Sequence, residues 1–253
     1  MPTPIELTFL GTRGEIEAHS RRHRRHSALL VCHAQARIMI DCGADWLDLL
    51  DCVSPSAIVL THAHPDHAWG LAHGAPCPVY ATAETLALLR GYRLHESRPV
   101  RPRRPFAFGE LSFEAFPVEH SIRAPAVGYR ISAAAGCFFY VPDVVAIRNR
   151  RRALKGVQLY IGDGAVVRRS MIRRRGKALI GHAPMVVQLG WCKAEHVSEA
   201  VFTHCGSEVV RGDARHLNSV VRRLGNEHGV EARIASDGLR LSLGNRGEDE
   251  SGS

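Results

Sequence analysis

The sequence predicts a layered α/β domain. Short apolar segments alternate with turn residues, helical patterns lie among them, and 45% of the 253 residues are apolar. This apolar content is enough for one sizeable core or two small ones, and it excludes a disordered chain. No internal repeat or low-complexity linker interrupts the pattern. We therefore expect one domain over residues 1–243 and a polar, frayed tail over residues 244–253.

The residue pattern in the first half of the chain predicts mainly strands. Each strand is a short apolar segment bounded by turn residues. The expected strands are Ile5–Leu10, Ser27–Cys32, Arg37–Asp41, Ala57–Leu60, Val79–Ala81, Leu111–Val118, Val127–Ser132 and Cys137–Val141. Helices are expected at Asp66–Ala72 and Ala83–Arg90.

The second half alternates strands with helices. The expected strands are Gln158–Gly162, Ala178–Gly181, Ala200–Thr203, Glu231–Ala235 and Leu239–Leu243. The expected helices are a basic one within Val166–Arg175, one within Met185–Ala194 and one over Asp213–Glu227. Gly229 is expected to stop the last of these, because glycine readily takes the left-handed conformation that ends helices.

The composition bears on the cellular location of the protein and on the redox state of its cysteines. No segment approaches 18 consecutive apolar residues, which predicts no membrane span. The first residues lack the charged and apolar regions of a secretory signal, so we expect a cytoplasmic protein. The seven cysteines are odd in number and form no C-x-x-C pair, which disfavours a disulfide framework or a cysteine zinc knuckle. Buried free thiols are the better interpretation.

The net charge of +8 comes almost entirely from arginine. Thirteen arginines lie in three short runs, within residues 21–25, 148–152 and 168–175. Such runs can attract phosphates or nucleic acid. The alternative is that each run is a solvated surface that reflects an arginine-rich genome.

The strongest local signal is a group of ligand-type side chains directly after a predicted strand. The segment reads Leu60-Thr61-His62-Ala63-His64-Pro65-Asp66-His67. In extended backbone, residues two apart point the same way, so His62 and His64 can reach one metal ion. A helix that begins near Pro65 would direct Asp66 and His67 toward a neighbouring point. Imidazole and carboxylate donors suit zinc and also accept manganese or iron.

With its H-x-H-x-D-H motif, the sequence resembles the metallo-β-lactamase superfamily, and the likeness covers nearly the whole chain. Leu7–Thr12 resembles the family's opening strand and glycine turn. Ile38–Gly43 resembles its I-D-x-G strand, whose aspartate, here Asp41, usually braces the metal loop. The resemblance implies an αββα four-layer sandwich with the active site at one edge.

The resemblance also implies two divalent metal ions, zinc first, with manganese or iron as alternatives. His62, His64 and His120 would hold one ion, while Asp66, His67 and His204 would hold the other. Asp143 would bridge them. Asp163, at another strand end, is the competing carboxylate, but the order of the family's motifs favours Asp143 and leaves Asp163 a supporting role.

Such a site implies hydrolysis. Two metal ions about 3.5–4 Å apart can share a hydroxide and stabilise both oxygens of a displacement. We assign catalytic roles to Asp66, at the metal site, and to His182, which precedes His204 by 22 residues. A histidine at similar spacing in the ribonuclease Z branch faces the scissile phosphate. It could stabilise charge there or protonate the leaving alkoxide. The alternative is a structural histidine bonded to backbone.

Four residues are candidates for substrate binding. Ribonuclease Z-like and cyclic phosphodiesterase-like proteins carry a polar loop with arginine and serine before the second strand, which points here to Arg24 and Ser27. In the expected basic helix, Arg169 and Arg173 are four residues apart and would share one face. Guanidinium groups bind phosphate in a bidentate manner.

Together these features predict a dinuclear metal-dependent phosphodiesterase. Its substrate would be a small or cyclic phosphodiester or a nucleic-acid end, and its nucleophile a metal-bridging hydroxide. Only 23 residues separate His120 from Asp143, which leaves no room for the long tRNA-gripping arm of ribonuclease Z. The cysteine cluster of the phosphonate-operon cyclic phosphodiesterase is also missing. One alternative is a metallo-hydrolase of a lactone or thioester. Another is a non-catalytic nucleic-acid-binding protein, which would not need seven ligands.

The expected partner is an anionic, phosphate-containing substrate, with nucleic acid as one candidate and no membrane. The sequence does not fix the oligomeric state, and a homodimer is compatible with it.

Overall fold

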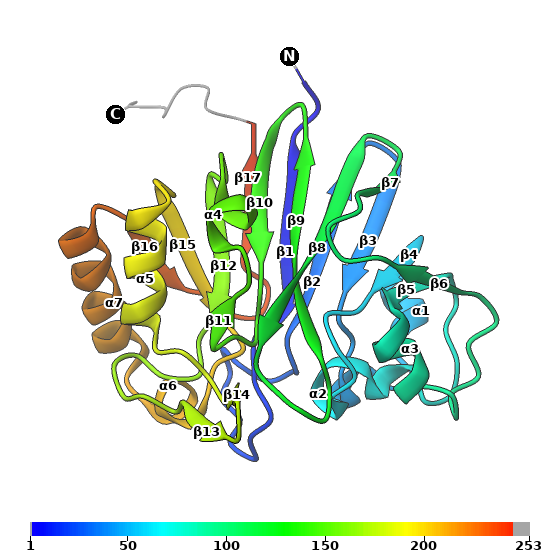
Figure 1. The fold of residues 1–253 in the computed structure, drawn as a ribbon, viewed down its shortest axis with the longest axis horizontal. Helices are drawn as coiled ribbons and strands as arrows, with labels where there is room; N and C mark the ends of the chain where they lie inside the picture. The colour runs from blue at the N-terminus through cyan, green and yellow to red at the C-terminus, as the bar shows by residue number, and fades with distance from the viewer. Residues whose placement is uncertain (1, 245–253) are drawn as a thin grey trace.

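Two β-sheets lie face to face at the centre of the molecule, as the computed structural model of the chain shows for residues 2–244 (Figure 1). The first sheet has the strand order β17-β1-β2-β3-β4-β5-β6. Its strands are β1 (Ile5–Gly11), β2 (Ala28–His33), β3 (Ala36–Ile40), β4 (Ala57–Val59), β5 (Val79–Thr82), β6 (Ser97–Val100) and β17 (Arg240–Leu243). Apart from Gly244, the expected polar tail lies outside the described residues.

The second sheet has the order β11-β8-β9-β10-β12-β15-β16, and β7 pairs with β8 beside this path. Its strands are β7 (Phe106–Phe108), β8 (Leu111–Glu119), β9 (Ala126–Ala133), β10 (Gly136–Tyr140), β11 (Ala146–Ile147), β12 (Leu159–Asp163), β15 (Glu199–Thr203) and β16 (Glu231–Ile234). The strands β10, β12, β15 and β16 run parallel, and β8 runs the same way because β9 is antiparallel to both β8 and β10.

Three apolar layers hold the sheets and helices together. The layer between the sheets is built by alternate residues of the strands, such as Leu7 and Phe9 of β1 against Phe113 and Tyr129 of the second sheet. Alternation places these side chains on one face of each strand. Their burial removes large apolar surfaces from water and is the main force that holds the two sheets together.

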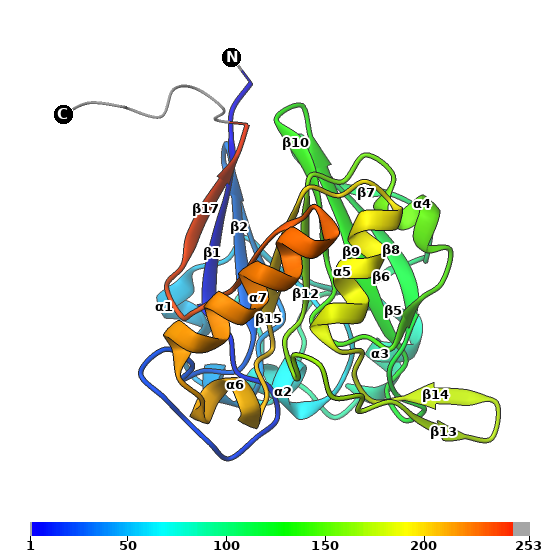
Figure 2. The ribbon, with the colours of Figure 1, turned by 90° about the vertical axis from the view of Figure 1, so that its left-hand side faces the viewer.

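Helices cover both outer faces, as Figure 2 shows for the second sheet. On the first sheet lie α1 (Leu50–Val53), α2 (Pro65–Ala68) and α3 (Ala83–Leu88), with 3₁₀ turns at Ala44–Trp46 and Trp69–Leu71. On the second lie α4 (Arg150–Leu154), α5 (Met185–Ala194), α6 (Ser207–Arg211) and α7 (Ala214–His228). Gly229 ends α7 in the left-handed conformation, as expected. The predicted αββα sandwich is confirmed. Within residues 2–244, no helix is long and apolar enough to cross a membrane.

The expected basic helix within Val166–Arg175 is wrong. Val166 and Val167 are buried in an irregular segment, and Arg173–Arg175 forms strand β13, which pairs with β14 (Ala178–Ile180) as a separate hairpin. Like charges four residues apart destabilise a helix, and residues 168–175 offer no acidic partner to relieve the repulsion. Gly176, with φ of +61°, supplies the turn conformation that closes the hairpin instead.

The sheet directions gather the ends of β4, β8, β10, β12 and β15 at one edge of the sandwich. Parallel strands end at the same side of a sheet, so the loops that follow them meet there. In both views this edge lies at the bottom, beside α2 (Figures 1 and 2).

Candidate metal centre

The H-x-H-x-D-H segment connects β4 to α2. His62 and His64 lie in the extended connection, and α2 begins at Pro65, whose ring fits the first turn of a helix because no backbone N–H is needed there. Asp66 and His67 follow in that first turn. His62 and His67 are fully buried, and Asp66 nearly so. One short connection therefore presents four donor side chains to the sheet edge.

Asp41 braces this segment through hydrogen bonds. Its carboxylate accepts hydrogen bonds from the Thr61 backbone N–H at 2.8 Å, from the Thr61 hydroxyl at 2.9 Å, and from Nδ1 of His67 at 2.9 Å. Asp41 is completely buried and has φ of +61°, a conformation that aspartate tolerates better than most residues. These contacts agree with the bracing role that the resemblance implied for Asp41.

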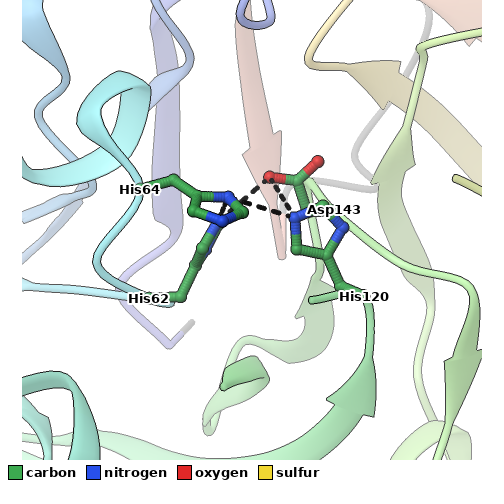
Figure 3. Close-up of side chains that lie close together, drawn as sticks. All are labelled: His62, His64, His120 and Asp143. Carbon is green, nitrogen blue, oxygen red and sulfur yellow. Dashed lines mark hydrogen bonds and ion pairs between the residues drawn. The ribbon is translucent and has the colours of Figure 1, made fainter. Parts of the chain in front are cut away.

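A first group of donors comprises His62, His64, His120 and Asp143, whose candidate ligand atoms lie within 4.8 Å of one another (Figure 3). Nε2 of His62 lies 3.0 Å from Nδ1 of His64, and Nε2 of His120 lies 3.3 Å from that same nitrogen. Oδ2 of Asp143 is 3.4 Å from Nε2 of His62 and 3.7 Å from Nε2 of His120. The four side chains come from the ends of β4, β8 and β10.

A second group comprises Asp66, His67, Asp143 and His204, again within 4.8 Å of one another. Oδ2 of Asp66 lies 2.9 Å from Nε2 of His204 and 3.3 Å from Nε2 of His67. The same Asp143 oxygen that faces the first group is 2.8 Å from Nε2 of His67. Asp143 is thus the residue shared by both groups, and the seven residues gather as the expected ligand sets require.

Unpaired buried atoms indicate that the groups fit metal ions. Nε2 of His67, Nδ1 of His204 and Oδ1 of Asp143 are buried and have no hydrogen-bond partner among the residues that the structure describes. Short N···O distances join these residues, yet the atoms are not aligned for hydrogen bonds with each other. Leaving a buried polar atom unpaired costs about 1–3 kcal/mol. Donor atoms that converge without pairing are what a shared cation would satisfy.

Hydrogen bonds at the far ring nitrogens orient three of the histidines. Nδ1 of His67 donates to Asp41, and Nδ1 of His120 donates to the Gly181 carbonyl at 3.0 Å. Nδ1 of His62 lies 3.0 Å from the Thr61 hydroxyl, which itself donates to Asp41. In each ring Nε2 is left with its lone pair directed at the cluster, the arrangement found behind histidine ligands of metals.

At His62, His64 and Asp143, electrostatics favour the ionisation states that metal binding needs, whereas nearby carboxylates raise the pKa values of His67 and His204 against the effect of burial. Burial, with nearby His67, holds the pKa of His62 well below its usual value, and burial and His120 lower that of His64 to about 4. Burial would raise the pKa of Asp143, but His120, His204 and His67 hold it well below the usual range. Neutral imidazoles and ionised carboxylates are the forms that ligate metals.

Asp163 and His182 form a pair beside the two four-residue groups, and together with His204 they make a third, three-residue set of ligand-type atoms. Nδ1 of His182 donates to Oδ2 of Asp163 at 2.8 Å and lies 3.2 Å from Oδ1 of Asp143. Burial would lower the pKa of His182, but Asp163 and Asp143 outweigh it and raise the pKa to about 11. Asp163 also accepts from the backbone N–H groups of Val144 and Ala165, so it links three loops at the sheet edge. Its carboxylate therefore supports His182 and the Asp143 loop.

A cavity of about 850 Å³ opens directly above the cluster. His64, Asp66, His120, Asp143, His182 and His204 form its floor. Its walls come from Gly14–Ile16, from residues 165–171 and from the start of α6. Among residues 2–244, Arg169 is the only arginine that lines the cavity, and Glu15 and Glu208 are acidic residues of its wall. The cavity volume matches that of sites for small ligands.

Only one of the four expected substrate-binding residues reaches the cavity. Arg169 lines it, from an irregular segment rather than from a helix. Arg173 lies on the exposed strand β13. Ser27 is completely buried, with its hydroxyl 3.3 Å from the Arg13 carbonyl, so it is not available to a ligand. Arg24 is exposed, away from the cavity lining, and its backbone N–H is tied to Asp237 at 2.9 Å.

Sequence reasoning missed the acidic wall residues. Glu15 follows the end of β1 and Glu208 lies in α6, a short helix that was not expected. The glycines at positions 11, 14 and 206 were an available signal that the backbone packs closely in these loops. At Gly14, for example, a Cβ would come within 2.9 Å of the His204 ring, so only glycine lets the backbone pass there.

The comparisons agree with this geometry. A family model described as a beta-lactamase superfamily domain matches residues 36–205. Ribonuclease Z from Methanopyrus kandleri is 29% identical over 151 residues, which cover 52% of this chain and 51% of the relative. An octanoyltransferase from Porphyromonas gingivalis is 31% identical over 147 residues, 47% of this chain and 28% of that protein. The chain thus spans about half of the length, or less, of the curated relatives that it matches.

Solved structures share the fold at low identity. The metallo-beta-lactamase fold protein YhfI from Bacillus subtilis has a TM-score of 0.75 at 16% identity, covering 95% of this chain and 99% of that one. A diphosphatase of the PhnP family has a TM-score of 0.72 at 20% identity, covering 96% and 98%. The short form of human tRNase Z has a TM-score of 0.64 at 16% identity, covering 94% and 99%.

Proposed function

Because this chain belongs to the metallo-β-lactamase superfamily, we propose that it is a metal-dependent hydrolase whose substrate is a phosphodiester. The observation that carries the proposal is the position of His182. This histidine lies outside both four-residue donor groups, lines the cavity above them, and is held by Asp163 through Nδ1. Ribonuclease Z among the matched relatives supports the same substrate class.

The donor groups would hold two divalent ions. His62, His64 and His120 would hold the first, Asp66, His67 and His204 the second, and Asp143 both. Zinc is our first choice, because imidazole and carboxylate donors suit it. When bound, two such ions lower the pKa of water and neutralise charge on phosphoryl oxygens. Asp66 contributes to this chemistry as a ligand beside the reaction centre.

The role of His182 is to deliver a proton. The bond from Nδ1 to Asp163 leaves Nε2 as the ring nitrogen that can act on a ligand in the cavity. Burial alone would lower the pKa of His182, but Asp163 raises it and so favours the protonated ring. We assign His182 as the general acid that protonates the leaving alkoxide, a role that typically contributes about 10²–10⁴-fold in rate.

Arg169 would bind the phosphoryl group. It is the arginine of the cavity wall, and its planar guanidinium can donate two parallel hydrogen bonds to phosphate oxygens. Glu15 and Glu208 on the same wall disfavour a second phosphate inside the cavity. The site therefore suits one phosphodiester group at a time.

A test compares three substrates with the metal-loaded protein: bis(p-nitrophenyl) phosphate, a lactone and a thioester. We expect turnover of the phosphodiester, its loss on chelation and its recovery when metal is restored. Turnover confined to the lactone or the thioester would contradict the proposal.

A hydrolase of neutral esters or thioesters is the second candidate. It is favoured by the apolar side chains of Ile16, Val166 and Met171 in the cavity wall and by the presence of two glutamates beside one arginine. An acyl chain would lie against these apolar groups without needing Arg169. The Arg169→Ala variant separates the two candidates, because it should impair only an anionic substrate.

A further inference from the structure

The β13–β14 hairpin is a separate two-stranded sheet that projects from the rest of the molecule (Figure 2). It spans Arg173–Ile180 and pairs Arg173 with Ile180 and Arg175 with Ala178. Both views place it at the same end of the molecule as α2, which carries Asp66 and His67 (Figures 1 and 2).

The hairpin carries a dense positive charge that no acidic group among residues 2–244 neutralises. Arg173, Arg174, Arg175 and Lys177 are all exposed. None of them takes part in an ion pair within residues 2–244, and residues 168–181 contain no aspartate or glutamate. By contrast, Arg150 and Arg152 of the preceding arginine run pair with Glu195 and Glu114. Three adjacent free guanidinium groups are costly to concentrate unless an anion binds them.

The root of the hairpin is bonded directly to the metal centre. The Gly181 N–H donates to the His120 carbonyl at 3.0 Å, and Nδ1 of His120 donates to the Gly181 carbonyl at 3.0 Å. Gly181 has φ of +108°, and a Cβ there would collide with the Met171 carbonyl, so the two ends of the hairpin close tightly. Arg169 and Met171, just before β13, line the cavity itself. The cavity wall and the charged hairpin are therefore one continuous surface.

The charge inside the cavity differs from the charge outside it. Inside the cavity, Arg169 shares the lining with two glutamates, Glu15 and Glu208, so the interior favours a single anionic group. Along the hairpin, no acidic side chain of the described part of the chain pairs with the positive charge. An extended polyanion would thus place one phosphate at the metal centre and its following phosphates on the hairpin. A cavity of this size takes one small ligand, so the end that enters it must be unpaired.

We propose that the β13–β14 hairpin binds the phosphate backbone of a single-stranded oligonucleotide whose end occupies the metal cavity. The hairpin makes the backbone contacts, which carry no base specificity. Binding itself depends only on the charges of the hairpin, whereas cleavage of the bound strand rests on the proposed phosphodiesterase function.

The test measures binding of a fluorescent, phosphorothioate-linked single-stranded oligonucleotide to the metal-loaded protein over a range of salt concentrations. The variant is Arg173→Gln/Arg174→Gln/Arg175→Gln, and its matched control is Arg215→Gln/Arg222→Gln/Arg223→Gln, which removes the same charge from exposed positions on α7. Each phosphate contact contributes about 0.7 to the slope of log affinity against log salt for single strands. The hairpin variant should lose about 2 from that slope and roughly tenfold or more in affinity at low salt, while the control changes little.

Hydrolysis of bis(p-nitrophenyl) phosphate should be unchanged in the hairpin variant, because that substrate is too short to reach the hairpin. Equal losses in the hairpin variant and its control, or no oligonucleotide binding by the wild type, would overturn the inference. So would hairpin-dependent binding to anionic lipid vesicles without binding to the oligonucleotide. Hairpin-dependent binding with no phosphodiester turnover would support the inference and contradict the proposed function. Phosphodiester turnover together with unaltered oligonucleotide binding by the hairpin variant would support the proposed function and contradict the inference.

Discussion

The Asp41 carboxylate accepts a hydrogen bond from Nδ1 of His67 at 2.9 Å, across 26 residues of sequence. The same carboxylate accepts from Thr61 at the start of the histidine segment. One buried side chain therefore fixes both the path of the backbone and the orientation of the His67 ring. Its negative charge also helps to raise the pKa of His67 against the effect of burial.

Asp41→Asn should weaken metal binding without removing a donor atom. The substitution keeps the size of the side chain but loses the charge that orients His67, and such supporting partners typically contribute about 10–100-fold to metal affinity. Competition with a chelator measures the change. Asp237→Asn is the matched control, because Asp237 accepts from Thr12, Arg24 and Arg25 in a loop away from the donor groups. Equal effects of both substitutions would contradict the bracing role.

Protein purified without chelator should contain about two divalent ions per chain, because the structure offers two four-residue donor groups. His64→Ala should lower the metal content and the activity together, since the structure places His64 within the first group. Elemental analysis checks both statements. A chain that takes up no zinc or manganese would exclude the assigned centre.

His182→Ala should separate chemistry from metal binding. Because His182 lies outside both four-residue donor groups, the metal content should remain, while turnover falls by roughly 10²–10⁴-fold with little change in KM. Metal analysis and steady-state kinetics on the same preparation provide the comparison with His64→Ala. If His182→Ala loses metal as fully as His64→Ala does, the general-acid assignment is wrong.

Arg169→Ala should raise KM for bis(p-nitrophenyl) phosphate by roughly tenfold or more, because a hydrogen bond to a charged group contributes about 1.5–3 kcal/mol. A neutral ester should be unaffected. Arg173→Ala is the control with the same substitution, since Arg173 lies on the hairpin outside the cavity. Steady-state kinetics at two ionic strengths measure KM for both variants. Similar KM values for the two would count against a phosphate contact at Arg169.

Gln188→Leu should destabilise the fold at the site. The buried Gln188 amide accepts from Tyr160 and from the Asp163 N–H, and it donates to the carbonyls of Asp163 and Ala183, over distances of 2.8–3.0 Å. Leaving such groups unpaired should lower the free energy of unfolding by roughly 2 kcal/mol or more. Denaturant titration measures it. Gln35→Leu, at an exposed turn position, is the control and should change stability much less.

Most of the regular elements could be predicted because their signals are local. Alternating apolar residues mark β1 and β8, and the Asp213 cap and Gly229 define the ends of α7. Short edge elements such as β6 and β7 were missed because their few residues carry no clear period. The helix expected within Val166–Arg175 failed for a different reason. Its apolar residues are anchored in the core at one end, and charge repulsion opposes a helix at the other.

The sequence by itself determined the metal ligands as candidates, because His62, His64, Asp66 and His67 are close along the chain and follow a strand end. The family resemblance added His120, Asp143 and His204, and only the tertiary structure decided which further groups act with them. The pairing of Asp163 with His182, the Gln188 amide behind it, and the presence of Glu15 and Arg169 in one cavity lining all join segments far apart in sequence. Such contacts depend on how the two sheets and their loops pack, and no local pattern records that packing. The same packing turns an arginine run into a hairpin bonded at its root to His120.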